Sequence, residues 1–247
     1  MSGWYEKYYW RIGFISQLYD LLTPESYLES MRKVAALLPD KQGQKVWDAG
    51  CGTGLLMSFL KNAMKKGMIY YGSDLLFAGL SQVRMRAKEL RCFDRFACFQ
   101  NDILTPAFKE KSLDVIVAHF SIYTIPDNVK RTQALKNMYH VLKSGGLLIV
   151  CCPSENYDAD KIIEESCELV VARKSPLEAG IKRFLFYSFT KRLGLNFIQK
   201  QLKSGKWITY TQEKLIEELR GAGFETGHSE TVYAGGAYLM CGHKVSG

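Results

Sequence analysis

The sequence has no Cys-x-x-Cys pair and only four histidines among its 247 residues, so it contains no zinc-binding pattern. Its seven cysteines are odd in number and lie mostly in apolar runs, which is typical of reduced, packed thiols. No stretch is long and uncharged enough to span a bilayer, and charges interrupt the aromatic N-terminus where a signal peptide would be apolar. The sequence therefore predicts a cytoplasmic protein without a metal site.

The chain length and its 47% hydrophobic content favour one α/β domain over residues 1–247, because two small domains would each have to bury a separate core. Short apolar runs alternate with segments of helical period, a pattern typical of a mostly parallel sheet with helices on both faces. The expected strands are residues 45–49, 68–73, 95–100, 113–119, 146–152, 224–233 and 237–243, the last two forming an antiparallel pair. The expected helices are residues 26–38, 55–66, 76–90, 128–142, 159–172 and 211–221.

Two segments fall outside this alternation. We expect residues 1–43 to form an N-terminal helical cap and residues 154–210 to form an insertion after the fifth strand. Seven of the eight excess positive charges lie between Ile181 and Tyr210, a stretch that contains no Asp or Glu. Large apolar residues in the same stretch need burial, so we expect the insertion to fold over the sheet as a substrate lid. These residues are Phe184, Leu185, Phe186, Phe189, Phe197 and Trp207.

The most specific motif is Asp48-Ala49-Gly50-Cys51-Gly52-Thr53-Gly54, between the first expected strand and an apolar helix. Glycines at such a turn let the backbone pass close to a ligand and present amides at a helix N-terminus. The spacing is Gly-x-Gly-x-Gly, whereas pyrophosphate-binding dinucleotide sites have Gly-x-Gly-x-x-Gly. Asp74 ends the second strand 20 positions after Gly54, where a carboxylate can accept hydrogen bonds from both hydroxyls of a ribose.

This motif resembles motif I of the class I S-adenosylmethionine (SAM)-dependent methyltransferases, and the resemblance continues in order from Tyr19 to Lys244. It implies a Rossmann-like fold of seven strands with an antiparallel final strand, and SAM as the cofactor. It also implies that Asp74 binds the ribose hydroxyls and that Leu75 packs on the adenine. The residues implied for the methionine and ribose side of SAM are Asp48, Gly50, Gly52 and Gly54, and Cys51 within the same motif is a further implied cofactor contact.

Two further cofactor contacts follow from the same resemblance. Asp102 would accept a hydrogen bond from the adenine amino group, and the backbone amide of Ile103 would reach a ring nitrogen; a plain turn role for Asp102 stays open. Residues 15–22 are similar to the Tyr-Asp element of the ubiquinone and menaquinone biosynthesis methyltransferases, in which the Tyr reaches the SAM site from a lid helix. Tyr19 is therefore a candidate contact, with an amphipathic core helix as the alternative.

The segment that follows the fourth strand, residues 118–127, is expected to select the methylated atom. It lacks the Asn/Asp-Pro-Pro-Tyr/Phe sequence of base-modifying relatives and is similar to the segment of small-molecule methyltransferases. His119 is a candidate general base and cofactor contact, because imidazole can take up a proton near neutral pH. Tyr123 is a candidate catalytic-site aromatic. A purely structural histidine at this strand end is an equally good interpretation of His119.

The sequence therefore predicts a SAM-dependent methyltransferase that acts on a small, apolar or aromatic molecule or a lipid. An RNA methyltransferase is one alternative, because a basic segment interleaved with aromatics can hold phosphates and stack bases. A SAM-fold protein that binds a membrane surface is another, with the basic segment among the lipid headgroups. Peripheral membrane contact is compatible with catalysis, and nucleic acid is the less favoured partner.

Overall fold

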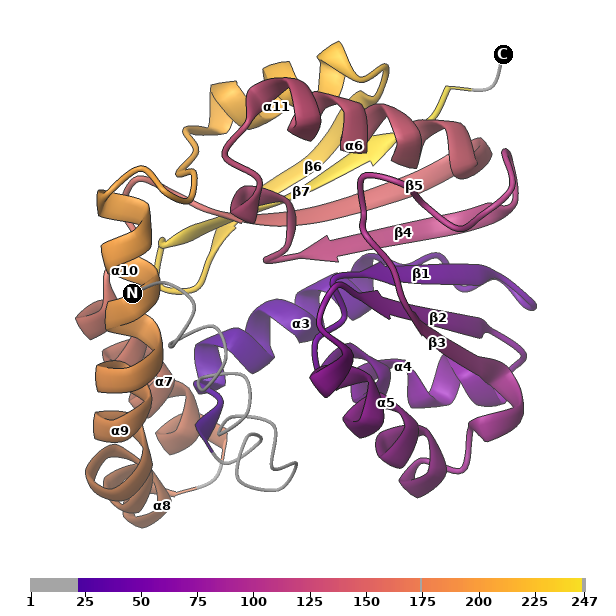
Figure 1. Ribbon diagram of the computed structural model, residues 1–247. Coiled ribbons are helices and arrows are strands. Elements are labelled where there is room, and N and C mark those ends of the chain that lie inside the picture. The colour runs from indigo at the N-terminus through magenta and orange to yellow at the C-terminus, as the bar shows by residue number, and fades with distance from the viewer. Residues whose placement is uncertain (1–21, 174, 246–247) are drawn as a thin grey trace.

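The computed structural model describes residues 22–173 and 175–245 and contains a seven-stranded sheet of order β3-β2-β1-β4-β5-β7-β6 (Figure 1). Strands β1 to β5 pair in parallel, and β7 runs antiparallel to both β5 and β6. The predicted fold class is thereby confirmed. The strands are β1 (Lys45–Ala49), β2 (Ile69–Asp74), β3 (Phe96–Gln100), β4 (Leu113–His119), β5 (Leu142–Pro153), β6 (Glu225–Val232) and β7 (Ala237–His243).

Helices lie on both sides of the sheet, with α4 and α5 on one side and α6 and α11 on the other (Figure 1). Their bounds differ from the expected ones by no more than one residue. Thr211 caps α11 as expected, since its hydroxyl accepts a hydrogen bond from the Lys214 amide at 3.2 Å. The helices outside the insertion are α3 (Glu25–Leu37), α4 (Leu55–Lys65), α5 (Phe77–Glu89), α6 (Asn128–Val141) and α11 (Gln212–Gly221), with short 3-10 turns η1 (Phe93–Arg95) and η2 (Ile122–Thr124).

The core lies between the sheet and its helices, and the central parallel strands are buried in it. Trp47 in β1 is fully buried and donates a hydrogen bond from its indole nitrogen to the Ser73 hydroxyl of β2 at 2.8 Å. In β4 the run from Val115 to Ala118 is buried on both faces, as a central parallel strand requires. Because β1 pairs in parallel with both β2 and β4, the carboxyl ends of these three strands meet at one edge of the sheet.

The fifth strand begins earlier than expected. The chain passes from α6 directly into β5, and residues 142–145, placed before the strand by the sequence pattern, belong to it. Leu113 pairs with Leu142 and Val115 with Leu147, so the extra residues form a bulge. Gly145 supports the bulge with a φ of +70°.

The insertion contains a run of helices that we call the helical arm, residues 159–203. The arm lies beyond the end of the sheet to which β4 points, with α8 and α9 farthest from the strands (Figure 1). A buried carboxylate on α3, Glu25, forms ion pairs with Arg173 and Lys182 of the arm at 3.4 and 3.7 Å. The arm comprises α7 (Ala159–Arg173), α8 (Pro176–Ile181), the π-helical η3 (Lys182–Tyr187), α9 (Ser188–Thr190), the π-helical η4 (Lys191–Leu195) and α10 (Asn196–Lys203).

The burial expected for the arm's large apolar residues is wrong at three positions. Phe184 is 82% exposed, Leu185 58% and Phe189 45%. Phe197 and Trp207 do pack, with ring centroids 5.7 Å apart. The helical run from α8 to α10 has one face buried and leaves the other exposed to solvent. The apolar character of these residues therefore did not show which of them would be buried.

All seven cysteines are free thiols, and five of them are buried. Burial raises the pKa of Cys51 and of Cys151 well above the usual thiol range, which makes both poor nucleophiles near neutral pH. Among residues 22–173 and 175–245, no helix is both long and apolar enough to cross a membrane.

Candidate functional site

The glycine turn, residues 50–54, joins β1 to α4 at the carboxyl edge of the sheet. Gly50, Gly52 and Gly54 have φ values of +85°, +53° and +71°, which residues with a Cβ rarely adopt. A Cβ on Gly50 would lie 2.5 Å from the Cβ of Ser121, whereas a Cβ on Gly52 would meet nothing within 4 Å. Gly50 is therefore required by packing, and Gly52 borders open space where a ligand can approach the backbone.

Asp74 closes this turn from the end of β2. Its carboxylate accepts hydrogen bonds from the amides of Gly52 and Leu76, both at 2.9 Å. Burial raises its pKa, although these amides act in the opposite direction. Leu75 and Phe77 follow and are each 61% exposed. An acid beside the turn and bare apolar side chains next to it form a surface that suits the ribose and base of a nucleoside.

Asp48 lies beneath the turn rather than on its surface. It is 3% exposed, and the Tyr70 hydroxyl donates a hydrogen bond to its carboxylate at 2.5 Å. Burial raises the pKa of Asp48 to about 7, the hydrogen bond from Tyr70 opposes this shift, and the charge of Asp74 adds to it. Our sequence analysis overlooked Tyr70; the available signal was a tyrosine inside a buried strand, whose hydroxyl needs a partner.

The loop after β3 holds the residues predicted to contact adenine. Asp102 is exposed, and its side chain accepts a hydrogen bond from the Leu104 amide at 2.9 Å. The turn role left open for Asp102 is therefore present. Ile103 is half-buried and packs against the core. The adenine contacts of Asp102 and Ile103 remain predictions.

His119 ends β4 and is 5% exposed. Its Nε2 lies 2.9 Å from the Ser30 hydroxyl of α3, and its Nδ1 is buried without a hydrogen-bond partner among the described residues. Burial lowers the pKa of His119 to about 3, so the ring is neutral near pH 7. A pKa this low makes His119 a weak base near pH 7, so its general-base role remains a prediction that rests on the unpaired Nδ1 alone.

Tyr123 belongs to a group of rings that we call the aromatic cluster. Its ring centroid is 5.4 Å from that of Trp207, and its carbonyl accepts a hydrogen bond from the Ile208 amide at 3.1 Å. The end of the insertion therefore packs against the segment after β4. Ring contacts of 5.2 to 6.2 Å join the whole cluster. Its members are Tyr27, Phe120, Tyr123, Tyr157, Trp207 and Tyr233.

Two small residues beside the turn were missed by the sequence analysis. Ser121 is buried, and its hydroxyl has no hydrogen-bond partner among the described residues. In α5, a Cβ on Gly79 would lie 2.4 Å from the carbonyl oxygen of Gly52. Gly79 thus lets α5 approach the glycine turn. Its signal was a glycine in the first turn of a helical pattern, which often marks a close backbone contact.

A buried ion pair braces the segment after β4. The Arg131 side chain is 2% exposed and forms a forked pair with Glu218 of α11, the shortest contact being 2.6 Å. Arg131 also donates a hydrogen bond to the carbonyl of Ile125 at 2.8 Å, and the Tyr210 hydroxyl donates to Glu218 at 3.0 Å. We call this group the buried brace. It connects the loop after β4 with the end of the insertion.

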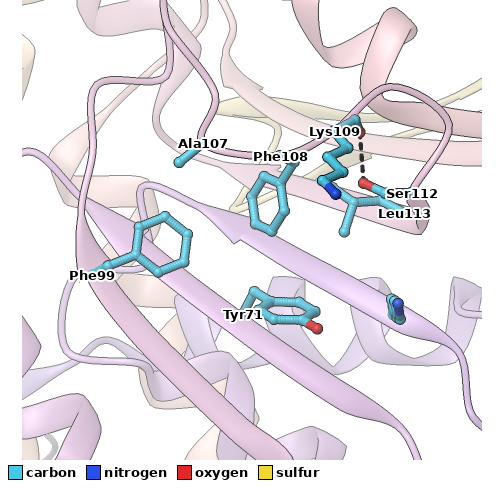
Figure 2. A pocket seen from close by; sticks show the side chains of 8 residues that line it. Tyr71, Phe99, Ala107, Phe108, Lys109, Ser112 and Leu113 are labelled. Atoms are coloured by element: carbon cyan, nitrogen blue, oxygen red, sulfur yellow. Dashed lines mark hydrogen bonds between the residues drawn. The ribbon is translucent and has the colours of Figure 1, made fainter.

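The hollow drawn in Figure 2 lies between β2, β3 and the segment that precedes β4. Its volume is about 350 Å³, and its lining includes Lys45 and Leu113, which begin β1 and β4. The ring of Phe108 packs against Tyr71 and Phe99 there, with centroids 5.4 and 5.7 Å apart (Figure 2). None of the residues that line this hollow belongs to the glycine turn, so the hollow is not part of that site.

One predicted contact cannot be placed beside the others, because Tyr19 lies outside the described residues. The structure brings together Asp48, Asp74 and the glycine turn at one edge. His119 and Tyr123 lie at the end of β4, the strand next to β1 in the sheet. The backbone thus presents the implied cofactor residues and the implied catalytic residues along neighbouring strand ends.

Comparisons with known proteins agree with this geometry. Residues 47–150 match a family described as a methyltransferase domain. The curated aklanonic acid methyltransferase DauC of Streptomyces sp. (strain C5) is 25% identical over 138 residues, which are 56% of this chain and 61% of that protein. The chain therefore matches less than two thirds of the length of this relative.

Solved structures share the fold at low sequence identity. A SAM-dependent methyltransferase from Aquifex aeolicus is 15% identical with a TM-score of 0.62, and the match covers 93% of this chain and 98% of that one. The [4+2]-cyclase SpnF is also 15% identical, with a TM-score of 0.59 and coverage of 88% and 82%. Because a cyclase shares the architecture, the fold alone does not define the reaction.

Proposed function

Because residues 47–150 form a class I SAM-dependent methyltransferase domain, we propose that this chain binds SAM and transfers its methyl group to a small, apolar or aromatic molecule. The observation that carries the proposal is the open glycine turn. Gly52 faces free space, Asp74 lies against its amide, and exposed apolar side chains continue from it. The aromatic cluster lies at the same edge of the sheet.

The residues present fit SAM. Asp74 would bind the ribose hydroxyls, Leu75 would lie against the adenine, and the backbone of Gly52 would approach the methionine part. Two buried polar atoms at this edge, Nδ1 of His119 and the hydroxyl oxygen of Ser121, have no hydrogen-bond partner among the described residues. Buried polar atoms of this kind need an explanation such as a bound water or ligand, and they support the proposal in that sense.

When bound, SAM supplies a methyl group made electrophilic by its sulfonium. The chain's own contribution is to bind, orient and exclude water, because a reactive nucleophile needs positioning more than it needs a base. His119 is neutral near pH 7 and could accept a proton from a substrate hydroxyl at Nδ1. Tyr123 packs against Trp207 of the insertion, so a substrate bound beside Tyr123 would also lie near the end of the insertion.

The aromatic cluster supports the proposed substrate class. Stacked and edge-on rings form a wall that favours flat, apolar molecules over charged ones. Phe120 has a φ of +51°, a conformation that costs free energy for a residue with a Cβ and is often found at binding sites. The matched relative is named for aklanonic acid, a small molecule, which is consistent with this class.

RNA is less well supported as the substrate. Two of the basic residues in the insertion are already ion-paired, Lys182 with Glu25 and Lys191 with Asp160. Fewer free charges therefore remain to neutralise phosphates than the sequence suggested.

Incubating the full chain with methyl-labelled SAM and a panel of aromatic hydroxy compounds, lipids and RNA tests the proposal. We expect label to appear in a small aromatic molecule and not in RNA. Label found only in RNA, or SAM binding without transfer to any small molecule, would contradict it. A Trp207→Ala variant should raise the KM for the substrate and leave SAM affinity unchanged, because Trp207 contacts Tyr123 and not the glycine turn.

A further inference from the structure

The helical arm carries an exposed face whose composition changes along its length. Its apolar half consists of Leu177, Ile181, Phe184, Leu185 and Phe189, which are between 45% and 82% exposed. Farther along the arm, the basic half consists of Arg192, Lys200 and Lys203, all exposed. We call the whole surface the arm face.

These residues share one side of a continuous helical run. Most neighbouring members are three or four residues apart, about one helical turn, and Arg192 and Lys200 are eight residues, about two turns, apart. The opposite side is buried at Ala179, Tyr187, Leu195 and Leu202. Figure 1 shows α8, α9 and α10 in one column at the outside of the molecule. The arm face is therefore a single surface on the side of the run opposite its buried residues.

The apolar half is an unusual surface for a protein in water. It encloses a shallow hollow of about 410 Å³ lined by Pro176, Leu177, Gly180, Ile181, Phe184 and Leu185. A contiguous group of exposed large apolar residues marks a binding surface more often than a scattered single residue does.

The charge of the arm indicates what kind of partner the arm face would bind. From residue 176 to 206 the chain has seven Lys or Arg residues and one acid, Glu178, which is half-buried. Lys182 and Lys191 pair with carboxylates of α3 and α7. Helices α8, α9 and α10 carry no exposed acid, and the exposed acids of the arm lie on α7. A partner with an apolar layer next to a negatively charged surface would be complementary to this face in both hydrophobicity and charge.

We propose that the arm face docks on an anionic lipid bilayer, with the apolar half in the acyl boundary and the basic half among the headgroups. An amphipathic helix lying in the interface plane requires this pairing of apolar insertion and cationic contact. Docking there would bring the carboxyl edge of the sheet toward the membrane, because Trp207, just after the arm, contacts Tyr123. The inference does not depend on the proposed methyl transfer.

Co-sedimentation of the full chain with vesicles tests this. We expect binding to vesicles of equal parts phosphatidylcholine and phosphatidylglycerol, weak binding to phosphatidylcholine alone, and loss at high salt. Leu177→Asp/Phe184→Asp should weaken binding by at least roughly tenfold, since each buried side chain contributes that much or more. The matched control is Phe93→Asp/Val129→Asp, which changes side chains 62% and 79% exposed on other elements and should bind normally.

A second set of variants tests the basic half. Replacing Arg192, Lys200 and Lys203 with Gln should weaken binding to the anionic vesicles by roughly a hundredfold, because each charge near such a surface contributes about 1 kcal/mol. The same change at Lys65, Lys88 and Lys136, exposed on other helices, should have little effect.

Three outcomes would overturn the proposal. The first is no binding of the wild-type chain to anionic vesicles, or binding that both variant sets leave unchanged. The second is a dimer in sedimentation velocity that Leu177→Asp/Phe184→Asp dissociates, which would assign the arm face to a second copy. The third is a fall in melting temperature for that variant as large as for a core substitution, which would show that the face packs within the chain.

Discussion

The glycine turn and the helical arm are organised by different physics. At the turn, the shape of the surface depends mainly on backbone conformation. Three glycines in the left-handed region present amide groups there, and one of these amides donates a hydrogen bond to Asp74. In the arm, side chains far apart in sequence decide, as when Glu25 of α3 pairs with Arg173 and Lys182. Local sequence therefore describes the first region well and the second poorly.

The largest effect is expected at the buried brace, where the insertion meets the sheet. Arg131→Gln should lower the free energy of unfolding by about 3 to 5 kcal/mol, because it leaves the Glu218 carboxylate unpaired in a largely buried position. The matched change Arg95→Gln removes an exposed pair with Asp94 and should cost at most about 1 kcal/mol. Urea denaturation measures both. Equal changes in the free energy of unfolding would show that the buried brace stabilises the fold no more than an exposed ion pair does.

Asp48 gives the next largest effect, through pH. Its pKa in the folded chain, about 7, is above the usual 3.8, so the stability that it contributes is present at low pH and lost as pH rises from about 4 to 7. Asp48→Asn should remove up to about 4 kcal/mol of this dependence. His119 has the opposite effect, because its lowered pKa reduces stability as pH falls from 6.5 to 3. The quantity to measure is therefore the difference in the free energy of unfolding between wild type and Asp48→Asn at each pH. A constant difference across that range would contradict the account.

Asp74→Ala should weaken binding of S-adenosylhomocysteine by about 2 to 3 kcal/mol, since a charge-assisted hydrogen-bond pair is lost. Asp94→Ala removes an exposed acid elsewhere and is the control. Asp74→Asn should fall between the two, because an amide keeps the shape but not the charge. Calorimetry that finds Asp74→Ala equal to wild type would remove Asp74 from the site.

The smallest effect separates two lysines of the insertion. Lys182→Gln should cost about 1 kcal/mol of stability, because Lys182 is mostly buried beside Glu25. Lys200→Gln should change stability by less than about 0.5 kcal/mol, since Lys200 is exposed. Identical melting curves for the two variants would mean that the arm's ion pairs do not hold it to α3.

Most of the fold, and the positions of the glycine turn and Asp74 within it, were predictable from the sequence for a physical reason. Strand ends, the glycine turn and Asp74 depend on short-range patterns, and these predictions lie where they were expected. The Ser30 hydroxyl beside His119, the Tyr70 partner of Asp48 and the exposure of Phe184 depend on which elements pack together. Periodicity shows that a helix has an apolar side but does not show whether another element covers it.

Calorimetric titration with S-adenosylhomocysteine tests the central claim most directly when it compares wild type with two glycine variants. Gly43 and Gly52 both have positive φ, +70° and +53°, and a Cβ on either would meet nothing within 4 Å. Valine therefore strains both positions similarly, but only Gly52 lies at the proposed site. We predict that wild type and Gly43→Val bind equally and that Gly52→Val does not bind. Binding by Gly52→Val, or no binding by wild type, would contradict the assignment of this turn as the SAM site.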